Sequence, residues 1–159
     1  MRLTQFSDYA LRTLLYLRVH ADRAIPLPEI ARAYGISYHH LVKVAGTLVE
    51  MGLVAAMRGR AGGFRLAKEP QDINVGAVIR RTEPDFYLVE CFDGTTDRCP
   101  ITPACKLRSI LMEAERSFLE VLDRHTLADF PADARHSGQL VQLWTDRQAL
   151  SGALEAGVS

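Results

Sequence analysis

Apolar side chains recur every three or four positions between residues 4 and 21, and this spacing places them on one face of a helix. Two arginines, Arg12 and Arg18, fall elsewhere on the helix surface. Two prolines then interrupt the pattern. The second of them, Pro28, suits the first turn of a new helix over 28–34. The apolar face of the first predicted helix consists of Phe6, Tyr9, Ala10, Leu14, Leu17 and Ala21.

A glycine separates the second predicted helix from a third. Gly35 ends residues 28–34 and allows the left-handed backbone that a tight turn needs. Ser37 is expected to cap a helix that runs to about residue 51, with Gly52 as its terminator. The residues expected to form an apolar core between these two helices are Ile30, Ala31, Tyr34, Ile36, Leu41 and Val44.

The pattern changes after residue 52. Two short apolar runs, 53–57 and 64–67, flank a basic, glycine-rich stretch, which predicts a β-hairpin. Asn74 is expected to cap another helix through residue 81. An irregular segment over 82–103 follows, and then a long amphipathic helix over 106–125. The apolar stripe of this helix consists of Leu107, Ile110, Leu111, Ala114, Phe118, Val121 and Leu122.

The order of helix, glycine turn, helix and basic hairpin is that of a winged helix-turn-helix. The predicted fold class is therefore mainly α with a small β-hairpin, in which a winged helix-turn-helix domain is followed by a long helix. Residues 131–159 are rich in Ala, Gly, Ser and polar residues. We expect them to form a partly disordered tail with a short helix over 139–150.

Charge divides the chain, although its formal net charge is zero. Residues 1–81 carry 12 Lys and Arg against 6 Asp and Glu, a balance of +6. Residues 82–159 carry 7 against 13, a balance of −6. An excess of positive charge in the half that holds the helix-turn-helix indicates a polyanionic partner, so we expect this half to bind double-stranded DNA.

The third predicted helix exposes polar and aromatic side chains once its apolar residues face the core. Residues near the start of such a helix meet base edges in the major groove. Arginines of the hairpin are expected to reach phosphates or a narrow minor groove. The candidate DNA-binding residues are Tyr38, His39, His40 and Lys43 on the helix, and Arg58, Arg60 and Arg65 on the hairpin.

Other classes of protein fit the sequence less well. The glycine-rich tip lacks the Gly-Lys-Ser/Thr ending of a phosphate-binding loop. The sequence also shows no nucleophile–base pair and no paired carboxylates, so an enzyme is not expected. Its longest aliphatic or aromatic run near the N-terminus is 14–17, which is too short for a signal peptide or a membrane span. We therefore expect a cytoplasmic protein, in which clustered cysteines more often bind metals or react than form disulfides.

Three cysteines precede the long helix: Cys91 and Cys99 lie in the irregular segment, and Cys105 lies directly before the helix. Their spacing is wider than zinc sites use, whereas an iron–sulfur cluster accepts it because its irons take separate ligands. Three thiolates are one ligand short of the usual four. Spacing leaves open which residue completes the site, and the eligible ones are Asp8, Glu90, Asp93, Asp97, His125 and His136.

Several motifs over residues 1 to about 130 resemble one bacterial family. They are the opening 1–4, 7–12 and 14–17, the helix start 36–41, the segments 52–54, 58–59 and 62–67, and the cysteine loop before a long helix. Together they are similar to the NsrR/IscR family of iron–sulfur winged-helix transcriptional regulators. The opening and the cysteine spacing are most similar to its NsrR-like members, which are nitric-oxide-sensing repressors.

The resemblance implies a homodimer that binds a palindromic operator through two recognition helices. It implies that the helix after Cys105 packs against its partner, and that Asp8 of the other subunit is the fourth ligand. IscR-like members place a histidine three residues after the last cysteine, where this chain has Arg108. The cluster expected from the resemblance is [4Fe–4S], with [2Fe–2S] as the alternative.

This interpretation divides the chain into four parts: a DNA-binding domain over 1–81, a cluster-binding loop over 82–105, a dimerisation helix over 106–130 and the tail over 131–159. Three alternatives remain open. The chain could be an IscR-like regulator of cluster supply, a thiol-based redox-sensing regulator, or a zinc-stabilised protein-interaction module with an incidental hairpin.

Overall fold

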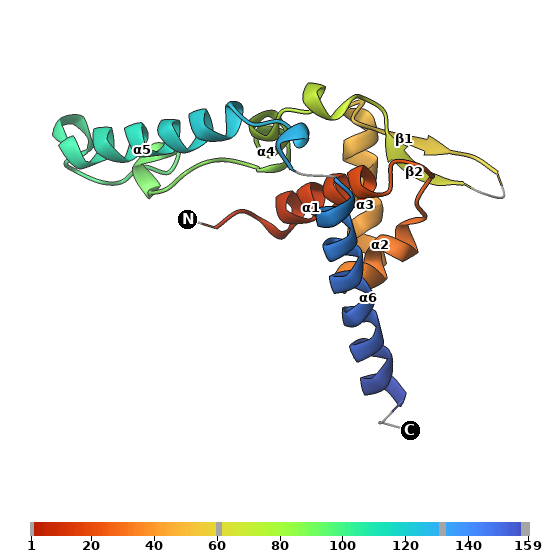
Figure 1. Ribbon diagram of the computed structural model, residues 1–159. Coiled ribbons are helices and arrows are strands. Elements are labelled where there is room, and N and C mark those ends of the chain that lie inside the picture. Colours follow the sequence, from red (N-terminus) through yellow and green to blue (C-terminus); the bar gives the residue numbers. More distant parts are fainter. Residues whose placement is uncertain (1, 60–61, 131–132, 157–159) are drawn as a thin grey trace.

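The computed structural model describes residues 2–59, 62–130 and 133–156, whose arrangement is shown in Figure 1. The predicted fold class is confirmed, because helices dominate and two antiparallel strands form a hairpin. Across the described part of the chain, no helix is both long and apolar enough to cross a membrane. The elements are α1 (Gln5–Val19), α2 (Leu27–Tyr34), α3 (Tyr38–Glu50), β1 (Val54–Met57), β2 (Gly63–Leu66), α4 (Val75–Thr82), α5 (Lys106–Asp123) and α6 (Ala134–Ala156).

The main core lies between α1, α2 and α3. Leu14 of α1, Ile30 of α2 and Leu41 of α3 are almost completely buried, as is Val44 one turn further along α3. Ile36, in the turn between α2 and α3, is buried as well. These side chains point inward as predicted. Full burial of each stabilises the fold by about 1.5–3 kcal/mol, so this cluster holds the helix-turn-helix together.

Helix α1 begins after Thr4, which caps it. The Thr4 hydroxyl accepts a hydrogen bond from the backbone N–H of Ser7 at 3.3 Å. The Thr4 N–H and hydroxyl in turn donate to Glu83 Oε1 at 2.8 and 3.0 Å. Because Glu83 directly follows α4, these contacts tie the start of α1 to the end of α4. They also fix the first turn of α1, which carries Asp8.

The hairpin is attached to the helices by a backbone bridge. Val54 lies opposite Leu66 in the strand pair, and the Ile25 and Phe64 backbones exchange two hydrogen bonds of 2.8 Å. Gly63, at the start of β2, lies directly against this bridge. A Cβ at Gly63 would come within 2.6 Å of the Ile25 carbonyl carbon. Glycine is therefore needed here because two backbones approach closely.

We expect Gly63→Ala to lower the free energy of unfolding by ~1–3 kcal/mol, because the added methyl must push the hairpin away from the Ile25 backbone. Denaturant unfolding followed by circular dichroism measures this change. Gly46→Ala in α3 is the matched control, since nothing lies within 4 Å of its Cβ position. That substitution should raise stability by up to ~1 kcal/mol. Equal effects of the two substitutions would contradict a close approach at Gly63.

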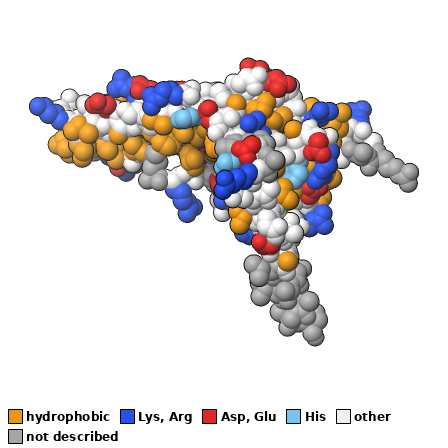
Figure 2. All heavy atoms as spheres, viewed as in Figure 1, with side chains coloured by type: hydrophobic (Ala, Val, Ile, Leu, Met, Phe, Trp, Pro, Cys, Tyr) orange, Lys and Arg blue, Asp and Glu red, His pale blue; other side chains and the backbone are white. Residues whose placement is uncertain are grey.

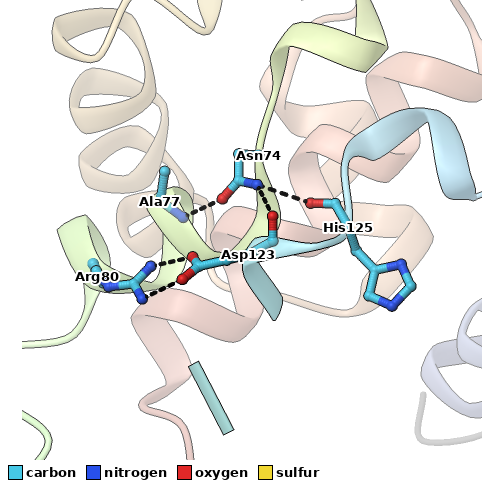
Figure 3. A network of polar contacts seen from close by, with 5 residues as sticks. All are labelled: Asn74, Ala77, Arg80, Asp123 and His125. Atoms are coloured by element: carbon cyan, nitrogen blue, oxygen red, sulfur yellow. Dashed lines mark hydrogen bonds and ion pairs between the residues drawn. The ribbon is translucent and has the colours of Figure 1, made fainter. Parts of the chain in front are cut away.

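Helix α5 extends away from the helix-turn-helix, and its C-terminal end is joined to α4 (Figures 1 and 3). Arg80 of α4 forms a bidentate ion pair with Asp123. The Asn74 side chain accepts from the Ala77 N–H at 2.9 Å, which confirms the predicted cap. The same amide donates to the carbonyls of Asp123 and His125 at 2.7 and 3.3 Å. Bidentate contacts fix direction as well as distance, so this joint sets the direction of α5.

The C-terminal segment differs from the prediction. Helix α6 extends beyond the expected short helix over 139–150 at both ends. It packs against α2, and Trp144 is only 8% exposed. Most of the stability of a helix comes from packing and not from its own propensity. Burial of this large aromatic side chain is therefore the physical reason for an ordered helix in a segment whose composition suggested disorder.

Candidate nucleic-acid interface and cysteine loop

The turn between α2 and α3 has the geometry of a helix-turn-helix. Gly35 adopts the left-handed conformation, with φ 64° and ψ 40°. The Ile36 N–H donates to the Ala31 carbonyl at 3.0 Å and closes the end of α2. Ser37 occupies the N-cap position of α3, although its side chain makes no capping hydrogen bond. This short, anchored turn fixes α3 relative to α2.

The predicted DNA-contacting face of α3 is exposed. Its buried residues, such as Leu41 and Val44, lie on the opposite side of the helix. The helix therefore presents one face to the core and an aromatic, basic face to solvent, which is the arrangement of a helix that enters the major groove. Which residue contacts which base stays a prediction. The exposed side chains are Tyr38, His39, His40 and Lys43.

His40 and Lys43 also border a cavity of about 290 Å³ between α1 and α3. The His40 ring lies 6.3 Å from the ring of Tyr9, which is on α1. Side chains of α1 and α3 therefore meet beside the predicted DNA-contacting face of α3. The rest of the cavity is lined by Gln5, Phe6 and Val44.

Two of the three predicted hairpin arginines lie in the described part of the chain, and both are exposed. Arg58 directly follows β1, and Arg65 lies on β2 opposite Ala55. Arg60 falls outside the described residues. The two exposed guanidinium groups give the hairpin the positive charge that phosphate contacts require.

Arg32 was not among the predicted DNA-binding residues. It is exposed on α2, and it borders the same open depression as Tyr38, of about 510 Å³. A guanidinium beside the recognition helix can contact a phosphate that flanks the bases. The signal that would have identified it is a basic, outward-facing position on the helix before the turn.

All three cysteines lie between α4 and α5, and all are free thiols. Cys91 and Cys105 are half-buried, whereas Cys99 is exposed. Asp97 organises the middle of the segment: it accepts hydrogen bonds from the Cys99 N–H at 3.0 Å and the Thr102 hydroxyl at 3.1 Å. The cysteines are therefore accessible on an ordered loop, and they are not part of the apolar core.

Arg108 joins the two ends of the cysteine loop. Its Nε donates to the Cys91 carbonyl at 3.1 Å, and its backbone N–H donates to Cys105 Sγ at 3.4 Å. The sulfur of Cys105 thus caps α5. From the sequence alone, Arg108 has no assigned function and is noted only because it stands where IscR-like members have a histidine. In the structure it holds Cys91 and Cys105 in one unit.

The side-chain donors of the cysteine loop can be compared with those that a single metal ion or an iron–sulfur cluster needs. Among the residues with described positions, no three His, Cys, Asp or Glu side chains converge as a single metal ion requires. A cluster does not need that convergence, because each of its irons takes a separate ligand. Three unpaired thiols on one loop are the donors that iron–sulfur clusters use. The donor chemistry of the loop therefore fits an iron–sulfur cluster.

Asp8 lies in the first turn of α1, whereas Cys105 lies at the N-terminal end of α5. Figure 1 shows the first turn of α1 well separated from the N-terminal end of α5, where Cys105 lies. The Asp8 carboxylate is partly exposed and pairs with Arg12, with N–O distances of 2.8 and 2.7 Å. The side chain is 41% exposed and therefore accessible to a second chain.

The other eligible fourth ligands make local contacts. Asp93 accepts hydrogen bonds from the Thr95 hydroxyl and N–H at 2.6 and 2.9 Å, which lower the pKa of Asp93. His125 and His136 lie beyond the cysteine loop, and each contacts an aspartate three or four residues away. Glu90 is exposed next to Cys91. These contacts do not select a fourth ligand, which stays a prediction.

Comparison with known proteins identifies the family. The model of the Rrf2 family, described as iron-dependent transcriptional regulators, matches residues 3–133. The HTH-type transcriptional regulator NsrR of Shouchella clausii is 42% identical over 149 residues, which cover 93% of this chain and 100% of that protein. NsrR of Bacillus subtilis is 45% identical over 130 residues, which cover 81% of this chain and 89% of that protein.

Solved structures agree with this result. T. potens IscR matches with a TM-score of 0.67 and 30% identity, covering 84% of this chain and 88% of that chain. CymR, the global cysteine regulator of B. subtilis, matches with a TM-score of 0.66 and 28% identity, covering 81% and 95%. The relatives are transcriptional regulators and not enzymes, which confirms the predicted role as a DNA-binding regulator of the NsrR type. This chain belongs to the Rrf2 family of iron-dependent transcriptional regulators.

Proposed function

We propose that this protein is a nitric-oxide-sensing repressor that binds a palindromic operator as a homodimer. Its iron–sulfur cluster, a [4Fe–4S] cluster by resemblance to NsrR-like proteins, would be held by Cys91, Cys99 and Cys105 and by Asp8 of the partner subunit. The observation that carries the proposal is three free thiols on one accessible loop in a chain 42% identical to a protein named NsrR.

The homodimer is supported by an exposed apolar face on α5. Leu107 and Ile110 are 61% and 60% exposed, and with Ala114 and Val121 they recur at intervals of three, four and seven residues, which places them on one face of the helix. Figure 2 shows hydrophobic side chains gathered over α5 and the loop beside it. Two helices bury a stripe of this spacing against each other. In a twofold dimer, the apolar faces of two copies of α5 pair with each other. Such a dimer presents two recognition helices to two half-sites.

The proposed ligands include one weak ligand, Asp8, which could be lost from the cluster while the three cysteines stay bound. Thiolates are strong ligands for iron, whereas a carboxylate oxygen is a weaker, more exchangeable one. When bound, the cluster supplies iron that reacts with nitric oxide. Asp8 has an alternative partner in its own chain, because Arg12 lies one turn along α1 and holds the carboxylate through two contacts. Asp8 therefore exchanges between the partner's cysteine loop and its own Arg12.

Release of Asp8 acts on DNA binding through α1. This helix packs on α3, and Tyr9, which follows Asp8, lies 6.3 Å from His40 of the recognition helix. When α1 is no longer tied to the partner's loop, the spacing of the two recognition helices changes and the dimer leaves the operator. For such coupling, the two states must differ in operator affinity by ~1–3 kcal/mol or more.

Anaerobic purification followed by visible spectroscopy tests the cofactor. A brown protein with iron–sulfur absorption supports the proposal. A colourless protein supports a zinc-stabilised module or a thiol-based redox regulator instead. Nitric oxide is then titrated while binding to a duplex, selected by the wild type from a random-sequence library, is followed. Unchanged affinity would contradict nitric-oxide sensing and favour a regulator of cluster supply.

Asp8→Ala should leave a cluster bound by three cysteines but abolish the response to nitric oxide. Wild-type operator affinity should change by ~5–150-fold on exposure, and that of the variant by less than ~2-fold. Arg12→Ala is the matched control, because it removes the same ion pair and keeps the carboxylate. It should still respond. Equal loss in both variants would assign the effect to the ion pair and contradict the ligand role of Asp8.

A further inference from the structure

We propose that α6 belongs to the DNA-binding unit, and that Trp144 and Arg147 are positioning residues for the recognition helix. The family match ends at residue 133, one residue before α6 begins. The inference concerns operator binding alone, so it holds whichever signal the protein senses.

Trp144 is the centre of an aromatic cluster that joins α6 to the first two helices. Its ring centroid lies 4.5 Å from that of Tyr16 and 5.7 Å from that of His20 at the end of α1. It lies 5.5 Å from the ring of Tyr34, in an edge-to-face arrangement. Burial raises the pKa of Tyr34 to about 12, so its phenol stays neutral. Aromatic pairs prefer particular geometries, and this cluster therefore fixes orientation as well as proximity.

The contacts of α6 are concentrated at the helix-turn-helix turn. Tyr34 is the last residue of α2 and directly precedes Gly35. The Arg147 guanidinium lies over Gly35, in the place that a side chain at position 35 would occupy. Helix α2 has only 8 residues, and so short a helix depends on packing for its position. Helix α6 provides part of that packing, because it contacts α2 and its Trp144 belongs to the same hydrophobic cluster.

The segment that leads into α6 is also fixed to α1. The Arg18 Nε donates to the Phe130 carbonyl at 2.8 Å, and its Nη2 donates to the Ala128 carbonyl at 3.3 Å. The chain that leaves α5 is therefore held on α1 before it forms α6. Helix α6 itself covers the turn, so that α2 keeps one orientation relative to α3.

The test uses the full chain, purified anaerobically, and the duplex that the wild type selects from a random-sequence library. Trp144→Ala should lower affinity for this duplex by at least ~10-fold, because the binding-competent orientation of α2 and α3 becomes a minor population. Affinity for a scrambled duplex should stay within ~2-fold, because nonspecific binding depends on phosphate charge. Trp144→Phe keeps a ring in the cluster and should recover most of the loss.

Leu143→Ala is the matched control, because Leu143 is the neighbouring residue and is 64% exposed. It should bind both duplexes like the wild type. Sedimentation and thermal unfolding establish that each variant is folded and dimeric at the temperature of the assay. A Trp144→Ala protein with the wild-type ratio of specific to nonspecific affinity would overturn the proposal. Equal loss of both affinities would do so too, because it would indicate a role in general stability only.

A second measurement needs no variant. Trp144 is the only tryptophan of the chain, so its fluorescence reports on the contact between α6 and the turn. During titration of the wild type with the selected duplex, Trp144 should stay shielded from acrylamide. An increase in quenching on binding would show that α6 leaves the turn in the DNA-bound form, and would overturn the proposal even if Trp144→Ala did not fold.

Discussion

Ile110→Asp is expected to convert the protein to a monomer and to lower operator affinity by ~10²–10⁴-fold, which is the gain that linking two binding modules provides. Ile110 is 60% exposed on the apolar stripe of α5, and a dimer would bury it. An unpaired carboxylate in such an interface costs several kcal/mol in desolvation. Sedimentation measures the oligomeric state, and fluorescence anisotropy with the selected duplex measures affinity.

Ser109→Asp is the control for this experiment. Ser109 is exposed on α5 next to Ile110, but helical spacing places it on the polar face with Glu113, Arg116 and Glu120. The same charge introduced there should leave both the dimer and its affinity unchanged. A dimeric Ile110→Asp protein would show that α5 does not form the interface, and the exposed stripe would then need another partner.

Substitution of Cys105 is expected to have the second large effect, because this residue has two roles that can be separated. Its thiol is a proposed cluster ligand, and its sulfur accepts the hydrogen bond that caps α5. Cys105→Ser keeps a good helix cap but removes the thiolate. Loss of a ligand should lower cluster occupancy at least as much as loss of a supporting residue does, by ~10-fold or more. Iron content and visible absorption measure the occupancy.

Cys105→Ala removes the cap as well and should also lower the free energy of unfolding, by ~1 kcal/mol relative to the serine variant. Both variants should lose the chromophore, and only the alanine variant should melt at a lower temperature. A Cys105→Ser protein that kept its full iron and sulfide content would contradict the role of Cys105 as a ligand. It would point to one of the local carboxylates in its place.

The helix-turn-helix could be predicted because its determinants are local. Leu41 and Val44 recur at helical spacing. Gly35 lies in the short turn between two helices and adopts the left-handed backbone conformation there. The full length of α6 and its packing against α1 and α2 could not be predicted in the same way. Its own amphipathic pattern is weak, and Trp144 is buried by residues of α1 and α2, far away in the sequence. Such a contact has no periodic signature.

The cysteine site shows the same limit. Spacing and composition were enough to single out Cys91, Cys99 and Cys105, because these residues share one short loop. The contact from Arg108 to the Cys91 carbonyl depends on how that loop folds back on α5, which spacing does not encode. A fourth ligand from a second chain has no fixed separation in sequence from the other three. Asp8 therefore rested on resemblance and not on pattern.

In the proposed dimer, the joint between α4 and α5 would set the distance between the two recognition helices. Arg80, Asn74 and Asp123 fix the angle at which α5 leaves the DNA-binding domain, and α5 is 18 residues long, or about 27 Å at 1.5 Å per residue. In a dimer formed along α5, the distance between the two recognition helices is set by a rigid rod and its fixed angle. Half-site spacing would then be encoded by the length of α5, whereas operator sequence would be read by α3, so that the two could evolve independently.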